Sequence, residues 1–303
     1  MPHGRHTDAV HRAQAVLDRL VDAVAQDGFD ALGLHVRTGD DTAQHLWAAD
    51  VRRDVHSVAK AVCVLAVGVA ADEGLLDVDA PVLRYLPHPR PGDGVDGVDG
   101  VTTRHLLAMT SGIDLPWSPT LLTDWPDLAV EYLGRPSRGR VFQYSNASTY
   151  TAARALAAVV GDVPAWLGPR LLAPLGVEDP RWDRCPLGFV AAGEGLHLSL
   201  DELARLGHLV RDEGAWRGRQ LVDPRWVRAM HSGWTERDAG PGYTRYALAG
   251  WGGPGRAWRL HGAYGQMLLL LDDAVVTVTA DDHAGADRMA VRVVEALEAT
   301  APR

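Results

Sequence analysis

The stretch Ser57-Val58-Ala59-Lys60, followed by an uncharged apolar run from Ala61 to Ala71, is the most informative part of the 303-residue sequence. The run predicts a buried core helix that is ended by Gly74. A spacing of three residues puts the serine hydroxyl and the lysine amine on one face of this helix, within reach of each other. At a helix start the backbone N–H groups lack partners, so the N–H of Ser57 can bind a negatively charged oxygen. A purely structural interpretation, in which Ser57 caps the helix, fits the same residues.

Lys60 is the only lysine of the chain, because every other basic residue is an arginine. Arginine stays protonated at any accessible pH, whereas a buried lysine can release its proton. A site that needs a removable proton would therefore have to keep its lysine. The opposing interpretation is that Lys60 is a chance survivor of a biased base composition.

A second candidate group is Tyr144-Ser145-Asn146, which precedes a predicted helix over Ala152 to Val160 and is expected on a loop. A phenol beside a lysine can accept the serine proton or pass it to a leaving group. The amide of Asn146 can orient the lysine and hold a substrate carbonyl. The structural alternative is a buried tyrosine beside a helix-capping asparagine.

The third candidate is a glycine-containing segment that leads into an apolar strand; its residues are Leu260, His261, Gly262, Ala263, Tyr264, Gly265 and Gln266. Glycines in a strand let a substrate backbone approach closely. A free N–H on this strand edge would complete an oxyanion hole opposite Ser57. We expect His261 to be structural or to contact substrate, because Lys60 and Tyr144 already supply the proton chemistry.

The two ends of the chain predict a sheet covered by helices, and the middle predicts mostly helices. The expected elements at the ends are helices over 9–26 and 286–299 and strands over 31–37, 44–49, 266–271 and 274–280. These patterns predict an α+β fold, in which a mainly antiparallel sheet from both termini packs against an inserted helical region with a cleft between them. The expected division is an α/β subdomain of about residues 1–60 and 241–303 and a helical subdomain of about residues 61–240.

Composition argues against several kinds of partner. A net charge of -9, a pI near 5.8 and the lack of a basic stripe argue against nucleic acid. The first 30 residues lack the features of a secretory signal, and the run from Ala61 to Ala71 is too short to cross a bilayer. We therefore expect a cytoplasmic protein without a membrane span. The 13 histidines form no metal-binding pair on one helix face, so we expect no metal and no other cofactor.

The order S-x-x-K, Y-x-N and a glycine-containing strand motif resembles that of the serine β-lactamase and penicillin-binding-protein family. This family includes class C β-lactamases, D-alanyl-D-alanine peptidases, esterases and 6-aminohexanoate-dimer hydrolases. The resemblance covers nearly the whole chain and includes residues 75–82 and 103–112, the second of which ends in Thr110-Ser111-Gly112. It implies a β-lactamase/transpeptidase-like fold.

The resemblance also implies roles for individual residues. By this resemblance Ser57 is the nucleophile, Lys60 the base and Tyr144 the proton relay. Asn146 is a positioning residue, and the N–H of Ala263 is the second oxyanion donor. The third motif departs from the K-T-G of lactamases and peptidases, because Leu260 and His261 align with its lysine and threonine. The pattern that ends in Gly265-Gln266 instead looks like the amide-hydrolase and esterase branch.

We therefore expect a serine hydrolase that cleaves a small amide or ester through an acyl-Ser57 intermediate. The residues expected to contact the substrate are Asn146, His261, Gly262, Ala263, Tyr264 and Gln266. An acyltransferase of a biosynthetic pathway would use the same acyl-enzyme, and the sequence does not separate it from a hydrolase. A non-catalytic binding protein on this fold is a third alternative, against which the intact Ser57, Lys60 and Tyr144 count.

Overall fold

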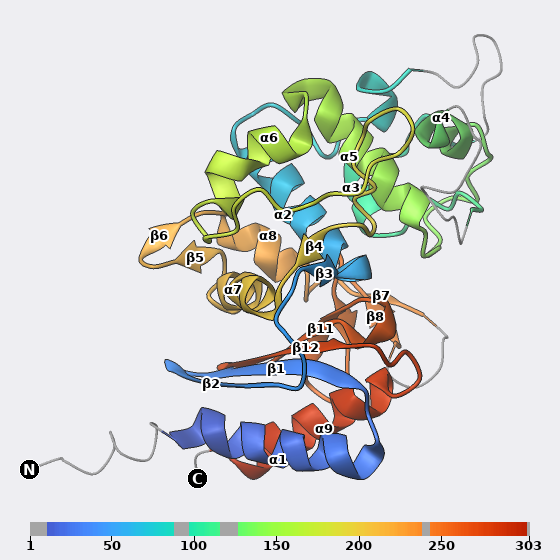
Figure 1. Cartoon of the computed structure of the whole chain (residues 1–303). Coiled ribbons are helices and arrows are strands. Elements are labelled where there is room, and N and C mark those ends of the chain that lie inside the picture. The colour runs from blue at the N-terminus through green and yellow to red at the C-terminus, as the bar shows by residue number, and fades with distance from the viewer. Residues whose placement is uncertain (1–10, 88–96, 116–126, 238–242, 302–303) are drawn as a thin grey trace, which may run out of the picture.

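A computed structural model describes residues 11–87, 97–115, 127–237 and 243–301 (Figure 1). Its central feature is an eight-stranded antiparallel sheet in the order β2-β1-β12-β11-β10-β9-β8-β7. The strands are β1 (Ala31–Thr38), β2 (Asp41–Leu46), β7 (Thr235–Glu236), β8 (Arg245–Tyr246), β9 (Trp251–Gly252), β10 (Trp258–His261), β11 (Met267–Leu271) and β12 (Ala274–Ala280). The N-terminal hairpin pairs with the last strand, which confirms that both termini build the sheet.

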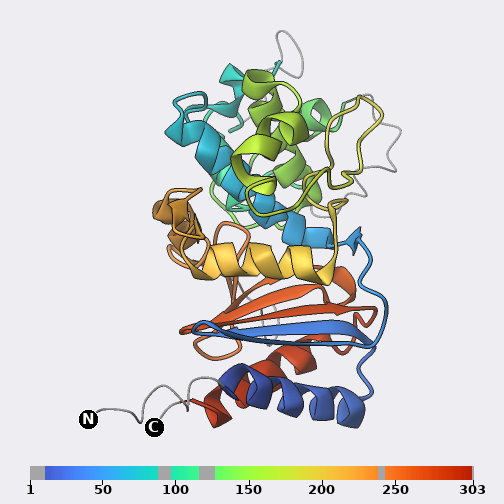
Figure 2. The same ribbon diagram turned by 60° about the vertical axis from the view of Figure 1, so that its left-hand side comes forward.

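Helices cover both faces of the sheet, which is why every residue of β11 and β12 is buried (Figure 2). The terminal helices α1 (Arg12–Asp27) and α9 (Ala286–Ala299) pack on one face. The other face packs against α7 (Leu200–Arg211). The predicted division of the chain assigns α7 to the helical part, whereas this amphipathic helix returns to the sheet.

The helical region is built around α2 (Ala59–Asp72), in which residues 59 to 70 are all buried. The prediction of a buried core helix after Ser57 is thus confirmed. The helices around it are α3 (Thr103–Leu107), α4 (Leu128–Leu133), α5 (Asn146–Val160), α6 (Val163–Leu167) and α8 (Pro224–Ala229). Gly68 lets α8 approach closely, since a Cβ at this position would lie 2.6 Å from Cγ of Trp226.

The middle of the chain is less helical than the sequence predicts. It contains the short pairs of β3 (Arg53–Asp54) with β4 (His197–Leu198) and of β5 (Ala215–Trp216) with β6 (Arg219–Gln220). Single helical turns lie at η2 (His56–Val58), η3 (Val82–Arg84), η4 (Gly168–Leu172) and η5 (Ala263–Gly265). Strands of two residues are too short to show a hydrophobic period, so no sequence pattern predicts them.

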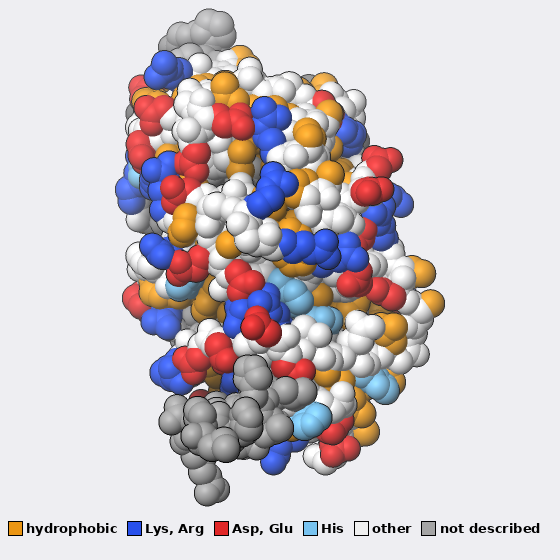
Figure 3. All heavy atoms as spheres, turned by 90° about the vertical axis from the view of Figure 1, so that its left-hand side faces the viewer, with side chains coloured by type: hydrophobic (Ala, Val, Ile, Leu, Met, Phe, Trp, Pro, Cys, Tyr) orange, Lys and Arg blue, Asp and Glu red, His pale blue; other side chains and the backbone are white. Residues whose placement is uncertain are grey.

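The face drawn in Figure 3 carries basic and acidic side chains that intermingle over the surface. Ion pairs such as Arg12–Asp273 and Arg37–Asp212 join segments that are far apart in the sequence. Within the described ranges, no single helix is long and apolar enough to cross a membrane. Together α5 and residues 163–172 have the required length and apolar character, but the two segments are bent by 70° relative to each other.

Candidate active site

Ser57 and Lys60 lie where β3 leads through η2 into α2, between the sheet and the helical region (Figure 1). Lys60 is on the first turn of α2, and only 2% of its surface is exposed. Its Nζ donates a hydrogen bond of 2.9 Å to Oγ of Ser57. The structure therefore brings together the two side chains that the three-residue spacing predicted to meet.

Lys60 has two further acceptors, both from distant segments. Its Nζ donates to Oδ1 of Asn146 at 2.6 Å and to the carbonyl oxygen of Gly193 at 2.7 Å. An ammonium group has three donors, and here each of them has an acceptor. Of the three partners, only Ser57 carries a proton at the contacting atom. A neutral Lys60 that kept its bonds to Asn146 and Gly193 would therefore direct its lone pair at the serine hydroxyl.

Asn146 is held in place by the backbone and by a carboxylate. It is the first residue of α5, which begins six residues earlier than predicted because the extended Ser145 already acts as the N-cap. Its Nδ2 donates to Oε2 of Glu194 at 3.0 Å, so its Oδ1 is turned toward Lys60. Burial raises the pKa of the Glu194 carboxyl, while the nearby charge of Lys60 acts in the opposite direction.

The segment Gly193-Glu194 was missed by the sequence analysis. A Cβ at Gly193 would lie 3.1 Å from Oδ1 of Asn146, so glycine lets the carbonyl and the amide converge on the lysine. A single carboxylate among small residues is a weak signal, and no motif marked it.

The turn before Ser57 is constrained by Asp54, which the sequence analysis also missed. His56 has φ 48°, a left-handed conformation that is strained for a residue with a side chain. Oδ1 of Asp54 accepts from the backbone N–H of His56 at 2.8 Å and from that of Gly195 at 2.9 Å. These bonds hold the turn that presents Ser57.

The end of β10 lies against the same turn. A Cβ at Gly262 would lie 2.3 Å from the carbonyl oxygen of Val55, so only glycine fits at this approach. Ala263 opens the turn η5, and Ser57 precedes the first hydrogen bond of η2, which runs from the N–H of Val58 to Val55. Ser57 and Ala263 thus lie on short helical turns of neighbouring segments, and the oxyanion hole that their N–H groups would form stays a prediction.

Gln266 was predicted to contact substrate, and the structure corrects this. The side chain is 3% exposed, and its Nε2 donates to the carbonyl oxygen of Ala280 at 2.6 Å. Gln266 therefore joins the end of β12 to the turn η5 and is not presented to a ligand. Tyr264, by contrast, is 48% exposed and lies 5.2 Å from the ring of His56, measured between centroids.

His261 is the last residue of β10, and its Nε2 is hydrogen-bonded to the hydroxyl of Tyr243 at 2.9 Å. Burial lowers the pKa of His261 to about 3, with the charge of Arg259 acting in the same direction. His261 is therefore neutral at neutral pH. Leu260 is 1% exposed and points into the core, so the side chain at the position of the K-T-G lysine is not presented to the site.

Tyr144 lies on the other side of Lys60, with the ring centroid 5.0 Å from Nζ. The ring packs against Trp251 at 5.3 Å and against Tyr246 at 5.8 Å. Among the described residues the Tyr144 hydroxyl makes no hydrogen bond to Ser57 or Lys60. The structure thus places the tyrosine beside the lysine, and its role as a relay stays a prediction.

A groove of about 650 Å³ opens beside Tyr144. It is lined by Arg140, Val141, Phe142, Gln143, Tyr144, Thr235, Glu236 and Arg237. Because Tyr144 contacts both Lys60 and this groove, the groove is the candidate substrate site. Among the described residues, no group of three or more His, Cys, Asp or Glu side chains is arranged to hold a metal ion.

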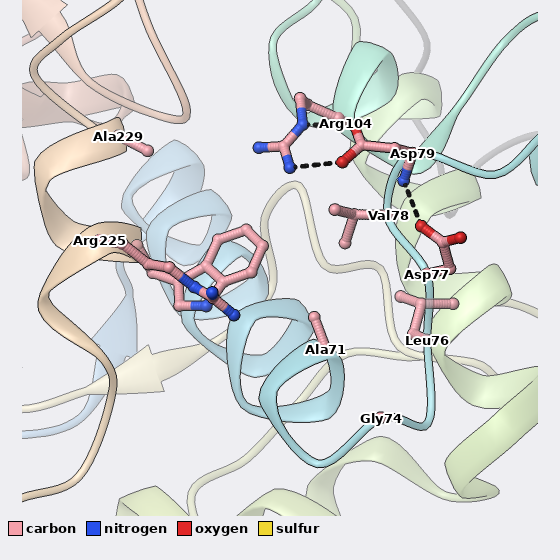
Figure 4. A pocket seen from close by; sticks show the side chains of 10 residues that line it. Ala71, Gly74, Leu76, Asp77, Val78, Asp79, Arg104, Arg225 and Ala229 are labelled. Atoms are coloured by element: carbon pink, nitrogen blue, oxygen red, sulfur yellow. Dashed lines mark hydrogen bonds and ion pairs between the residues drawn. The ribbon is translucent and has the colours of Figure 1, made fainter.

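A second hollow, of about 450 Å³, lies at the other end of α2 (Figure 4). Its two arginines are already paired, Arg104 with Asp79 and Arg225 with Asp72. Ala71, in its wall, is separated from Lys60 by three helical turns, or roughly 16 Å. This hollow is therefore separate from the candidate active site.

Comparison with known proteins identifies the family to which this chain belongs. A family model described as β-lactamase matches residues 11–297, and the chain belongs to the β-lactamase family. The chain is 29% identical over 230 residues to the 6-aminohexanoate-dimer hydrolase of Paenarthrobacter ureafaciens. This match covers 68% of the chain and 55% of the relative, so the chain spans about half the length of that protein.

Solved structures confirm the fold prediction. A family VIII carboxylesterase superposes with a TM-score of 0.75 at 15% identity, covering 96% of this chain and 98% of the other. A class C β-lactamase from Rhodobacter sphaeroides gives a TM-score of 0.73 at 16% identity, covering 94% and 99%. The chain is thus a β-lactamase-family protein with a hydrolase among its relatives, and the similarity to these structures shows the fold alone.

Proposed function

We propose that the protein is a serine hydrolase that cleaves a small amide or ester through an acyl-Ser57 intermediate. The observation that carries this proposal is the set of three acceptors around Nζ of Lys60. Two of them, at Asn146 and Gly193, can only accept, so a neutral Lys60 is oriented to take the proton of Ser57.

The proposed reaction then follows in two steps. Oγ of Ser57 attacks the substrate carbonyl while its proton passes to Lys60, and the N–H groups of Ser57 and Ala263 stabilise the oxyanion. The proton passes through Tyr144 to the leaving group as the bond to the carbonyl carbon breaks. Water then attacks the acyl-Ser57 ester, its proton returns through the same groups to Ser57, and the free acid leaves.

An ester or amide is favoured over a β-lactam because the third motif offers no cation. Leu260 stands where lactamases have the K-T-G lysine, and His261 is neutral because its pKa is lowered to about 3. A charge-assisted hydrogen bond is worth about 1.5 to 3 kcal/mol, so its absence would weaken lactam recognition by roughly ten- to a hundredfold.

The test is a side-by-side measurement of kcat/KM for 4-nitrophenyl butyrate and nitrocefin at pH 6 and pH 8. We expect the ester to be strongly preferred, with no gain for the lactam at pH 6, because His261 stays neutral at both values. Comparable efficiency on the two substrates would contradict the assignment. Adding candidate amines to the ester reaction reports acyl transfer, since a transferase would form the amide in place of the free acid.

A further inference from the structure

We infer that Tyr246 donates a hydrogen bond to the oxygen of Tyr144 while that oxygen carries negative charge during proton transfer. The inference rests on the proposed function and adds a positioning residue to it, one that acts on the substrate only through Tyr144. Three observations support it: the unused hydrogen of the Tyr246 hydroxyl, the packing of its ring beside Tyr144, and the commitments of the neighbouring polar groups.

The hydroxyl of Tyr246 is a buried donor that the fold does not use. Tyr246 ends β8, and the residue is 1% exposed. The backbone N–H of Ala249 acts on the hydroxyl oxygen, but among the described residues the hydroxyl donates no hydrogen bond, and it has no access to solvent. A buried polar group without a partner lowers stability, and most such groups in native proteins are paired. An unpaired one therefore needs a reason.

The other two tyrosines that are buried within the described ranges use their hydroxyl groups to join segments of the fold. The hydroxyl of Tyr132 is hydrogen-bonded to Oγ of Ser111 at 2.7 Å. That of Tyr150 lies 3.2 Å from Sγ of Cys185 and accepts from Arg154 at 3.2 Å. The remaining buried hydroxyl joins no segments in this way, so a purely structural role does not account for it.

Tyr246 packs beside the proposed relay. Its ring stands nearly perpendicular to that of Tyr144, at 83°, with 5.8 Å between the centroids. Trp251 contacts both rings, at 4.7 Å from Tyr246 and 5.3 Å from Tyr144, and so fixes them relative to each other. Burial raises the pKa of Tyr246 well above its ordinary value, and a negative charge on Tyr144 acts in the same direction. Tyr246 therefore keeps its proton and remains a donor, and the two hydroxyl groups are close enough to interact.

The other titratable groups that face the two phenols are already committed. Nζ of Lys60 has three acceptors. The thiol of Cys63, on α2, stays protonated because burial raises its pKa to about 12. The hydroxyl of Tyr243 is hydrogen-bonded to Nε2 of His261, and burial raises its pKa. Among the described residues around the relay, Tyr246 is thus the hydroxyl whose hydrogen is unused.

The proposed reaction places charge where this hydrogen can act. Tyr144 gives its proton to the leaving atom as the bond from that atom to the carbonyl carbon breaks, and it takes a proton from Lys60. While these transfers are under way, the oxygen of Tyr144 carries part of the negative charge of a phenolate. A hydrogen bond to a charged oxygen is stronger than one to a neutral oxygen, so Tyr246 stabilises this state more than the resting state. Catalytic hydrogen bonds are often absent at rest and form only as the reaction proceeds, which fits the unbonded hydroxyl.

A double-mutant cycle of Tyr246→Phe and Tyr144→Phe tests the inference with phenyl butyrate, whose leaving oxygen needs a proton. Tyr246→Phe alone should lower kcat/KM by about tenfold. Added to Tyr144→Phe, it should change kcat/KM by less than about twofold, because no oxygen remains to receive its bond. Its melting temperature should be equal to or above that of the wild type, since no hydrogen bond of the folded protein is lost. Tyr150→Phe is the matched control: it removes a bonded hydroxyl and should lower the melting temperature while changing kcat/KM by less than about twofold.

Equal losses from Tyr246→Phe in the two backgrounds, or no loss in the wild-type background, would overturn the inference and leave the proposed function intact. If the wild-type protein hydrolyses no ester, the proposed function fails. The rate at which a phenyl phosphonate labels Ser57 in the same four proteins then decides the inference without turnover. A labelling rate that Tyr246→Phe lowers only when Tyr144 is present supports it, and any other pattern, including no labelling, overturns it.

Discussion

The basic side chains of the Lys60 site and of the groove beside Tyr144 differ in what surrounds them. Lys60 is 2% exposed and has three acceptors within 2.9 Å, all supplied by the protein. Arg237 is oriented by two aromatic rings at 5.3 and 5.5 Å. The first arrangement is complete before substrate arrives, as catalysis requires of a preorganised site. Among the described residues Arg237 has no ion pair, so its side chain is positioned by ring contacts alone. Three of the four predictions that follow concern the Lys60 site and Tyr144, which links it to the groove, and the fourth concerns stability elsewhere in the fold.

The largest effect is expected at Lys60. Lys60→Arg should lower kcat by roughly a thousandfold or more and be nearly as damaging as Lys60→Ala, because arginine keeps the charge but cannot release its proton. Steady-state kinetics with 4-nitrophenyl butyrate measure this. If the arginine variant kept substantial activity, a positive charge at position 60 would be enough for catalysis. Lys60 would then differ from Arg237 only in its burial.

Tyr144 belongs to both regions and should show the next largest effect. Tyr144→Phe keeps the ring that packs against Trp251 and removes only the hydroxyl. We expect kcat/KM to fall by roughly a hundredfold with an unchanged melting temperature, if the phenol relays protons. Near-normal kinetics with a lowered melting temperature would instead show that the residue serves packing.

Glu194 tests whether the Lys60 site depends on the carboxylate behind it. Glu194→Ala removes the acceptor for Nδ2 of Asn146 and should lower kcat by about tenfold, the value of one lost hydrogen bond. Glu194→Gln keeps an acceptor oxygen and should lose less. Equal losses in the two variants would show that the charge of Glu194 matters, and not the orientation of Asn146.

The smallest effect concerns stability and lies outside both regions. Burial lowers the pKa of His208 to about 3, well below the ordinary value near 6.5 that the unfolded chain would show. As pH falls from about 6.5 toward 3, the unfolded chain binds a proton that the folded protein does not, so stability is lost over this range. His208→Leu should make the free energy of unfolding less dependent on pH between 7 and 5. An unchanged dependence, measured by urea denaturation, would contradict this assignment.

Contacts that depend on local spacing could be predicted from the sequence. Ser57 and Lys60 are three residues apart on one helix turn, and the structure brings them together. The fold class followed from strand patterns at the two ends and from the resemblance of three ordered motifs, which also suggested that Asn146 would orient the lysine.

Contacts with distant segments that carry no recognisable motif could not be predicted. Gly193 is 133 residues from Lys60 in the sequence, and a backbone carbonyl gives no residue-type signal at all. Arg237 is one arginine among many, and the ring contact that orients its guanidinium is defined only by the fold. Gln266 was misjudged because the turn η5, with Tyr264 at φ 58°, directs the following side chain inward.

The most direct test of the central claim is to locate the acyl group on the protein. The wild-type protein is mixed briefly with an activated ester, quenched in acid, and analysed by intact mass and by peptide mapping. We expect a mass gain of one acyl group on the peptide that contains Ser57 and no gain in Ser57→Ala. A covalent adduct on another residue, or turnover by Ser57→Ala at the wild-type rate, would contradict the assignment of Ser57 as the nucleophile.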